Sequence, residues 1–171
     1  QLSQNMNFIM DITVEDFLTM HAKVRLGKEI ENEKAIIAKC FSMANELAGE
    51  KFTLDTKVTQ LSGGQSRALM IADVACISSS PIVLIDEIEN AGIDKQKALN
   101  LLCRQDKLVL VVTHDPHTAL MSEQRIVLSG GAITAVVRRT PTEEILYRQL
   151  ETEYQKQRLY QTLLRKGEPL V

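Results

Sequence analysis

Residues 61–65, with the sequence Leu-Ser-Gly-Gly-Gln, have the side chains and the spacing to bind a phosphate group. Ser62 can cap the start of a helix, and Gln65, three residues later, can complete a capping box. The two glycines between them would let a phosphate approach bare backbone amides at a helix N-terminus, where the macrodipole attracts anions. A capped helix after a glycine turn, without any ligand, explains the same five residues equally well.

Asp86 and Glu87 directly follow a short apolar run at residues 82–85. A β-branched run that stops at acids is typical of a parallel strand buried on both faces. Because α/β sheets bind ligands beyond the carboxyl ends of their strands, both acids are candidates for chemistry. Asp86 could hold magnesium through water, and Glu87 could orient or deprotonate an attacking water. A strand that ends in solvated acids is the alternative interpretation.

His114 stands two residues beyond a second apolar run, residues 108–112. If the two runs form neighbouring parallel strands, His114 projects from the same sheet edge as Asp86 and Glu87. It could then donate a hydrogen bond to a phosphate oxygen. An incidental histidine beside a helix cap is the alternative.

Helices and strands are expected to alternate along the chain after residue 62. Apolar spacing, caps and turn residues predict helical segments at residues 13–49, 65–78, 94–102, from 115 onward, and 140–166. Short β-branched runs predict strands at residues 82–85, 108–112, 125–128 and 132–137. This alternation predicts an α/β layer structure with right-handed crossovers.

The composition is that of a single globular domain. The chain has 171 residues, of which 44% are hydrophobic and 25% are charged. A net charge of −2 and an aromatic content of 4% argue against nucleic acid as a partner. No apolar run approaches the ~20 residues that a membrane span needs, and no signal peptide is visible.

The cysteines and two of the histidines carry no motif of their own. Cys40, Cys76 and Cys103 are odd in number and widely separated, which indicates buried thiols in a reducing compartment rather than disulfides or a zinc site. His21 and His117 lack any surrounding motif, and we expect both to be surface residues.

The three motifs, in this order, resemble those of the ABC ATPase family, the nucleotide-binding domains of ATP-binding-cassette proteins. Residues 61–65 match the family's signature motif, residues 82–87 match Walker B with its following glutamate, and residues 113–115 match the switch-histidine loop. Residues 91–94 look like the D-loop. Gln4, nine residues before Thr13, looks like the Q-loop that leads into a helical subdomain.

The resemblance implies an α/β fold with a P-loop NTPase-like parallel sheet, an α-helical subdomain and a C-terminal helix. Three segments are then expected: residues 1–60 with the Q-loop and helical subdomain, 61–139 with the other motifs of the ATPase core, and 140–171 as a C-terminal helical extension.

A Gly-x-x-x-x-Gly-Lys-Ser/Thr phosphate loop (Walker A) occurs nowhere in the chain. The family pattern places that loop upstream of Gln4, so we expect a truncated nucleotide-binding domain. The family also places the strand that feeds the loop between residues 108–112 and 125–128. Without that strand the sheet is expected to be incomplete, repacked or completed by another chain.

The resemblance also implies a composite site in a head-to-tail dimer that buries two ATP molecules. The signature residues would bind the γ-phosphate of the ATP held by the partner domain, and they are Ser62, Gly63, Gly64 and Gln65. Asp94, in the D-loop, would lie at the dimer seam.

Four residues would act on the ATP that the chain's own domain holds. Asp86 would organise magnesium, Glu87 would act as general base and His114 would contact the γ-phosphate. Gln4 would reach the metal or the attacking water. Phosphoryl transfer depends mainly on positioning and charge stabilisation, so residues from two chains can switch it on by meeting.

The leading hypothesis is the ATP-binding and ATP-hydrolysing subunit of an ABC transporter, with ATP and Mg²⁺ bound. Its expected partners are a second nucleotide-binding domain and a transmembrane permease, and its expected place is the cytoplasmic face of the membrane. The chain alone is expected to be inactive. The alternatives are a soluble ABC-type ATPase of DNA repair or translation, and a non-catalytic partner that supplies the signature motif in trans.

Several positions depart from the family pattern. Ile88-Glu89-Asn90 follows the catalytic glutamate where the family has Pro and then Thr or Ser, and the segment up to Asp94 is one residue longer than usual. Glu89 therefore adds a negative charge near the expected phosphate site. Asp73 stands where the family commonly has arginine.

Overall fold

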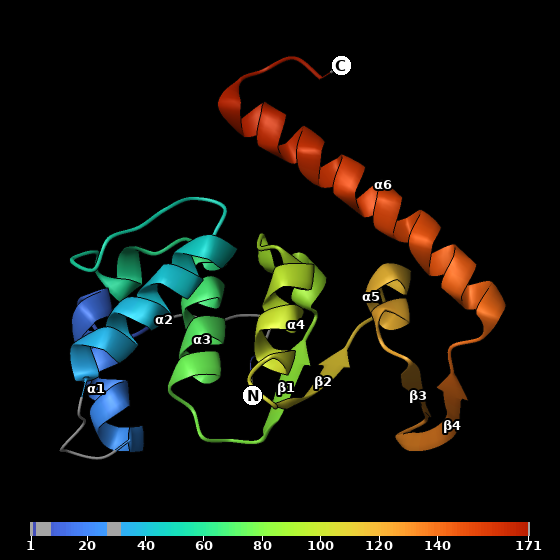
Figure 1. The fold of residues 1–171 in the computed structure, drawn as a ribbon, viewed down its shortest axis with the longest axis horizontal. Coiled ribbons are helices and arrows are strands. Elements are labelled where there is room, and N and C mark those ends of the chain that lie inside the picture. Colours follow the sequence, from blue (N-terminus) through green and yellow to red (C-terminus); the bar gives the residue numbers. More distant parts are fainter. Residues whose placement is uncertain (1, 3–7, 27–31, 171) are drawn as a thin grey trace. The chain divides into compact units, whose positions relative to one another are not determined.

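The computed structural model describes residues 2, 8–26 and 32–170. The chain divides into two units, Gln1–Thr113 and His114–Val171. The first unit contains a group of helices and a parallel strand pair, and the second contains a hairpin and a long helix (Figure 1).

Three helices form the core of the first unit: α1 (Val14–Leu26), α2 (Glu33–Leu47) and α3 (Gly63–Cys76) (Figure 1). Thr13 caps α1, since its hydroxyl accepts a hydrogen bond from the Asp16 amide at 3.1 Å. The helices bury one continuous apolar cluster, whose largest members include Phe17, Leu18, Ile37, Phe52 and Leu69. Helices α1 and α2 therefore lie within the helical region predicted at residues 13–49.

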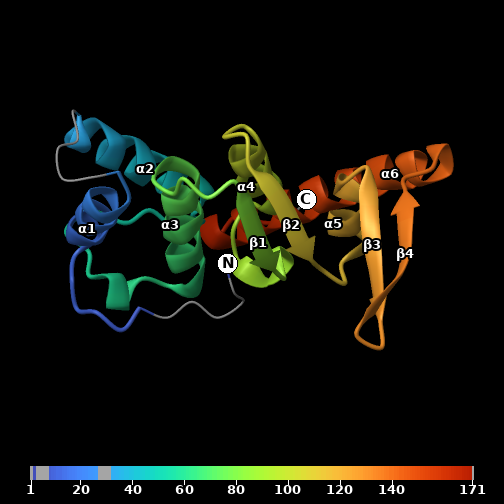
Figure 2. The same cartoon turned by 90° about the horizontal axis from the view of Figure 1, so that it is seen from below.

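A parallel strand pair follows the helices. β1 (Ile82–Asp86) pairs with β2 (Leu108–Val112) so that Asp86 lies opposite Val112 (Figure 2). The connection between them carries a 3-10 turn, η2 (Ile88–Ala91), and helix α4 (Lys95–Cys103). On the other edge of β1, the Leu2 amide donates to Leu84 O at 2.8 Å, and Leu2 O accepts from the Asp86 amide at 3.0 Å.

The expectation that β1 is buried on both faces is wrong for the described residues. Val83 and Ile85 are buried, but Ile82 and Leu84 are exposed. Their neighbours on β2 at the same register positions, Leu108 and Leu110, are exposed as well, and so is Val112. No described element covers this face, although parallel sheets normally have both faces covered.

The second unit begins with α5 (Pro116–Met121), which Asp115 caps, and a two-stranded antiparallel hairpin. The hairpin joins β3 (Gln124–Ser129) to β4 (Ala132–Arg138) through Gly130 and Gly131, both with positive φ. The described strands thus form two separate two-stranded sheets. This agrees with the expectation of a sheet that is incomplete without the Walker A strand.

Helix α6 (Pro141–Lys166) lies where a helix is predicted, and its start is well defined: Thr140 and Glu143 form a capping box, and Pro141 takes the first position. His117 connects α5 to α6, because its Nε2 lies 2.8 Å from Glu151 Oε2 and its ring stacks on Tyr147. His117 is only 4% exposed, so the expectation of a surface residue is wrong.

The expectation that all three cysteines are buried thiols holds only in part. Cys40 is buried in the helical cluster, Cys76 is half-buried beside it, and Cys103 is exposed at the end of α4. All three are free thiols. Within the part of the chain that the structure describes, no helix has the length and hydrophobicity to cross a membrane.

Candidate functional site

The signature segment forms the start of α3, with the capping box that the sequence predicts. Ser62 Oγ accepts from the Gln65 amide at 3.3 Å, and Gln65 Oε1 accepts from the Ser62 amide at 2.8 Å. Gln65 Nε2 also donates to Glu50 O at 3.3 Å. Gln65 therefore fixes the helix start, while Ser62 and Gly63 are exposed at a terminus that favours anions.

The D-loop-like segment lies next to the signature segment. A Cβ atom on Gly92 would stand 3.9 Å from Gly64 Cα. Gly92 has φ +65°, a left-handed conformation that glycine adopts without strain. The two motifs are therefore neighbours in the fold although 28 residues of sequence separate them.

The end of β1 brings the two acids to the predicted sheet edge. Asp86 and Glu87 are half-buried, and the Glu87 amide donates to Val112 O at 3.0 Å. Glu87 has φ +47° and ψ +61°, the left-handed region that costs a non-glycine residue about 1–3 kcal/mol. Ile88, next in the chain, is completely buried. The candidate general base thus sits in a strained backbone that its neighbours hold.

Arg67 on α3, two residues after the signature, is a buried cation near these acids. Its guanidinium donates to the backbone oxygen of Asp86, and its residue is only 3% exposed. Burial lowers the pKa of the Arg67 guanidinium, and the negative charges of Asp86 and Glu89 oppose that shift.

Glu89 does not present a free negative charge to the expected phosphate site. Thr113 Oγ1 donates to Glu89 Oε1 at 2.6 Å, and the charge of Glu89 also acts on Arg67. The departure from the family pattern is therefore compensated within the fold by a cation and a hydroxyl.

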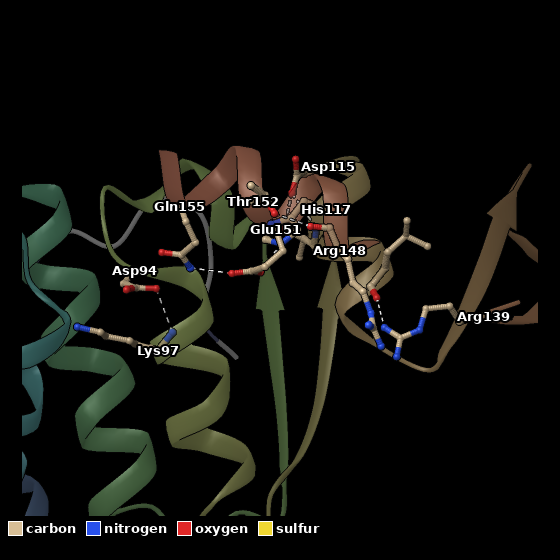
Figure 3. A network of polar contacts seen from close by, with 11 residues as sticks. Asp94, Lys97, Asp115, His117, Arg139, Arg148, Glu151, Thr152 and Gln155 are labelled. Atoms are coloured by element: carbon tan, nitrogen blue, oxygen red, sulfur yellow. Dashed lines mark hydrogen bonds and ion pairs between the residues drawn. The ribbon is translucent and has the colours of Figure 1, made fainter. Parts of the chain in front are cut away.

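Asp94 caps α4, and its Oδ1 accepts from the Lys97 amide at 3.1 Å (Figure 3). The residue is 9% exposed. The structure therefore gives the Asp94 carboxylate a local capping role, and a place at a dimer seam remains a prediction.

The remaining predicted site residues lie outside this group or outside the described residues. His114 is exposed and begins the second unit, directly after Thr113. The condition attached to its prediction is met, because β1 and β2 are parallel neighbours. Gln4 lies outside the described residues.

The residues at the β1 end fit a magnesium ion bound mainly through phosphate. Such ions take one or two carboxylates and fill their other positions with phosphate oxygens and water. Asp86, half-buried at the strand end, can supply one carboxylate. A dedicated cluster of three or more His, Cys, Asp or Glu side chains is not found among the described residues.

Asp73 has a partner that explains its place in the signature helix. His21 Nδ1, on α1, lies 3.0 and 3.1 Å from the two Asp73 carboxylate oxygens. Burial raises the pKa of the Asp73 carboxyl, and the contact with His21 opposes the shift. His21 is half-buried, so the expectation that it is a surface residue is wrong.

The sequence analysis gave no role to Arg67, included Thr113 only within the switch-histidine motif, and noted Glu89 only as a departure. A signal for Arg67 exists, because it is the one cation within the otherwise largely apolar segment that follows the signature. No local pattern marks Thr113, since its partner Glu89 lies 24 residues earlier.

Comparison with known proteins finds ABC transporter ATP-binding proteins, while no family model matches the chain. An uncharacterized ABC transporter ATP-binding protein of Methanocaldococcus jannaschii is 54% identical over 150 residues, which cover 88% of this chain and 56% of that protein. An energy-coupling factor transporter ATP-binding protein of Onion yellows phytoplasma is 29% identical over 75% of this chain and 47% of its own length.

A solved structure of a dimeric ATP-binding cassette, in a post-hydrolysis state bound to ADP and Pi, matches with a TM-score of 0.59 and 26% identity. The match covers 79% of this chain and 60% of that one. The fold is thus the α/β fold of P-loop NTPases. The relatives are ABC transporter ATP-binding proteins and the structural neighbour is an ATP-binding cassette, and the chain spans about half the length of the curated relatives it matches.

Proposed function

We propose that the chain is the signature, Walker B and switch-histidine part of the ATP-binding subunit of an ABC transporter. The observation that carries the proposal is the juxtaposition at one end of α3 and β1. There the Gly92 turn lies beside Gly64 in the capped helix start, and Arg67 of the same helix donates to the carbonyl oxygen of Asp86 at the end of β1.

Each residue has a proposed role in ATP hydrolysis. Ser62, Gly63 and Gly64, with Gln65 holding the helix start, bind the γ-phosphate of an ATP molecule held by a second nucleotide-binding domain. Asp86 holds Mg²⁺, which supplies charge neutralisation at the phosphates.

The proposed catalytic residues lie at or just after the ends of β1 and β2. Glu87 accepts a proton from the attacking water, and His114 donates a hydrogen bond to the γ-phosphate. Gln4 contacts the metal or water, and Asp94 lies at the seam between domains. These assignments rest on the motif matches and on the geometry of the strand ends.

The activity needs a phosphate loop, which the 171 residues do not contain. A phosphate-loop segment from outside these residues would also cover the exposed apolar face of β1 and β2. We therefore assign ATP hydrolysis to this chain together with such a segment. The proposed partners are a second nucleotide-binding domain and a transmembrane permease at the cytoplasmic face of the membrane.

A comparison of two proteins tests the proposal. The 171-residue chain alone is expected to bind ATP weakly and to show no turnover in a phosphate-release assay. The natural gene product that contains these residues is expected to hydrolyse ATP, and Ser62→Arg is expected to abolish turnover by blocking the signature end of α3. A gene product that binds ATP but never hydrolyses it would favour the non-catalytic partner instead.

A further inference from the structure

The strained backbone of Glu87 requires an explanation in the residues around it. At φ +47° the residue occupies the left-handed region, and it is a glutamate rather than a glycine. Residues in this region keep such a conformation only when surrounding contacts over-determine it. The contacts on both sides of Glu87 should therefore be identifiable.

On the N-terminal side of Glu87, the backbone is held by a hydrogen bond from a side chain of α3. The guanidinium of Arg67 donates to the carbonyl oxygen of Asp86, which is the peptide oxygen that immediately precedes Glu87. Arg67 is buried, and a buried cation needs charge-assisted contacts to offset its lost hydration. A side chain so constrained restrains the peptide to which it donates.

After Glu87, the backbone is fixed through β2. The Glu89 carboxylate accepts the Thr113 hydroxyl at 2.6 Å, a short charge-assisted hydrogen bond. Ile88, between the two glutamates, is completely buried. Glu87 itself donates its amide to Val112 O, one residue before Thr113.

We propose that Arg67, Glu89 and Thr113 are positioning residues that hold Glu87 in its left-handed conformation. The inference rests on the proposed function, in which Glu87 is the general base. Held in this way, the base does not relax to an ordinary backbone conformation between turnovers. Relaxation would change the direction of its side chain, and a misplacement of about 1 Å costs on the order of 100-fold in rate.

The variants that test this proposal are Thr113→Val, which removes the hydroxyl donor, and Glu89→Gln, which removes the charge that faces Arg67. Thr113→Ser keeps the donor and serves as the conservative rescue. Glu153→Gln, at an exposed position on α6, is the matched control for Glu89→Gln. Thermal unfolding establishes that each variant is folded.

The first readout is independent of activity: amide hydrogen exchange of Glu87, whose N–H is bonded to Val112 O. In the 171-residue chain we expect exchange to accelerate at least about tenfold in Thr113→Val and Glu89→Gln, and to return to the original rate in Thr113→Ser. Unchanged exchange at Glu87 in both folded variants would overturn the proposal.

The second readout is steady-state ATP hydrolysis by the natural gene product. We expect kcat to fall at least about tenfold in both variants while KM for ATP stays within about threefold, because binding groups are untouched. Full kcat in the variants, beside an active wild type, refutes the positioning role and leaves the proposed function intact. An inactive wild type with accelerated exchange in the variants refutes the proposed function instead and supports the positioning contacts.

Discussion

At the scale of single residues, several side chains of the candidate site have a structural role as well as a proposed chemical one. Ser62 and Gln65 close the capping box of α3, and Asp94 caps α4. The same residues are the proposed phosphate and dimer contacts. A substitution at these positions therefore changes a helix terminus as well as a binding surface, and the two effects need separate measurements.

Glu87 offers a direct test of backbone strain. Glycine tolerates positive φ, so Glu87→Gly is expected to raise the free energy of unfolding by up to about 1 kcal/mol, despite the entropy that glycine loses on folding. Glu87→Gln keeps the strain and is expected to leave stability unchanged. Urea unfolding of the 171-residue chain measures both. A marked loss of stability in Glu87→Gly would show that the left-handed conformation is not strained.

The site residues differ in how far the sequence could predict them. The capping box at Ser62 follows from four neighbouring residues, so local sequence is sufficient. The contact between Thr113 and Glu89 depends on the pairing of β1 with β2, which is a tertiary property. The buried position of His117 likewise depends on α6 packing over α5, where its partner Glu151 lies 34 residues later in the chain.

At the scale of elements, α3 links the signature to the rest of the first unit through charged side chains on opposite sides. Arg67 faces β1, and Asp73, nearly two turns later, faces His21 on α1. Apolar periodicity predicted the helix, because its period depends only on spacing. It could not predict what the two buried charges contact, since those partners come from other elements.

The contact between α3 and α1 predicts a pH dependence. Because the pKa of Asp73 is raised in the folded protein, its contribution to stability is greatest below the unfolded value of about 3.9 and declines as pH rises through the folded value. The stability of the wild type relative to Asp73→Asn is therefore expected to increase as pH falls from about 7 to about 4. Urea unfolding at a series of pH values measures this difference, and a decrease toward acid pH would contradict the assignment.

The two faces of β1 predict different losses of stability for substitutions at neighbouring positions. Ile85 is 1% exposed, so Ile85→Ala is expected to lower the free energy of unfolding of the 171-residue chain by about 2–4 kcal/mol. Leu84 is 45% exposed, so Leu84→Ala is expected to lower the free energy of unfolding of the same chain by less than about 1 kcal/mol.

In the natural gene product, we expect the loss of unfolding free energy from Leu84→Ala to approach that from Ile85→Ala, since we propose that the phosphate-loop segment packs on this face of the sheet. Chemical unfolding of both proteins provides the comparison. Equal, small costs for Leu84→Ala in the two proteins would argue that nothing packs on this face.

At the scale of the whole molecule, sequence motifs predicted the family correctly and the α/β class with it. They also predicted a sheet without its Walker A strand, and the described strands form two separate pairs. The exposure of one face of β1 was not predicted, because an apolar run shows that a strand is apolar and not which neighbours are present to cover it.

We propose that Asp86 and Glu87 form the catalytic strand end of an ABC ATPase, with Glu87 as the general base. The most direct measurement is ATP hydrolysis by the natural gene product and by its Glu87→Gln variant, together with ATP binding by both. We predict that the variant loses at least about 100-fold in kcat while its ATP affinity is retained. Equal turnover in the two proteins would show that Glu87 is not the general base.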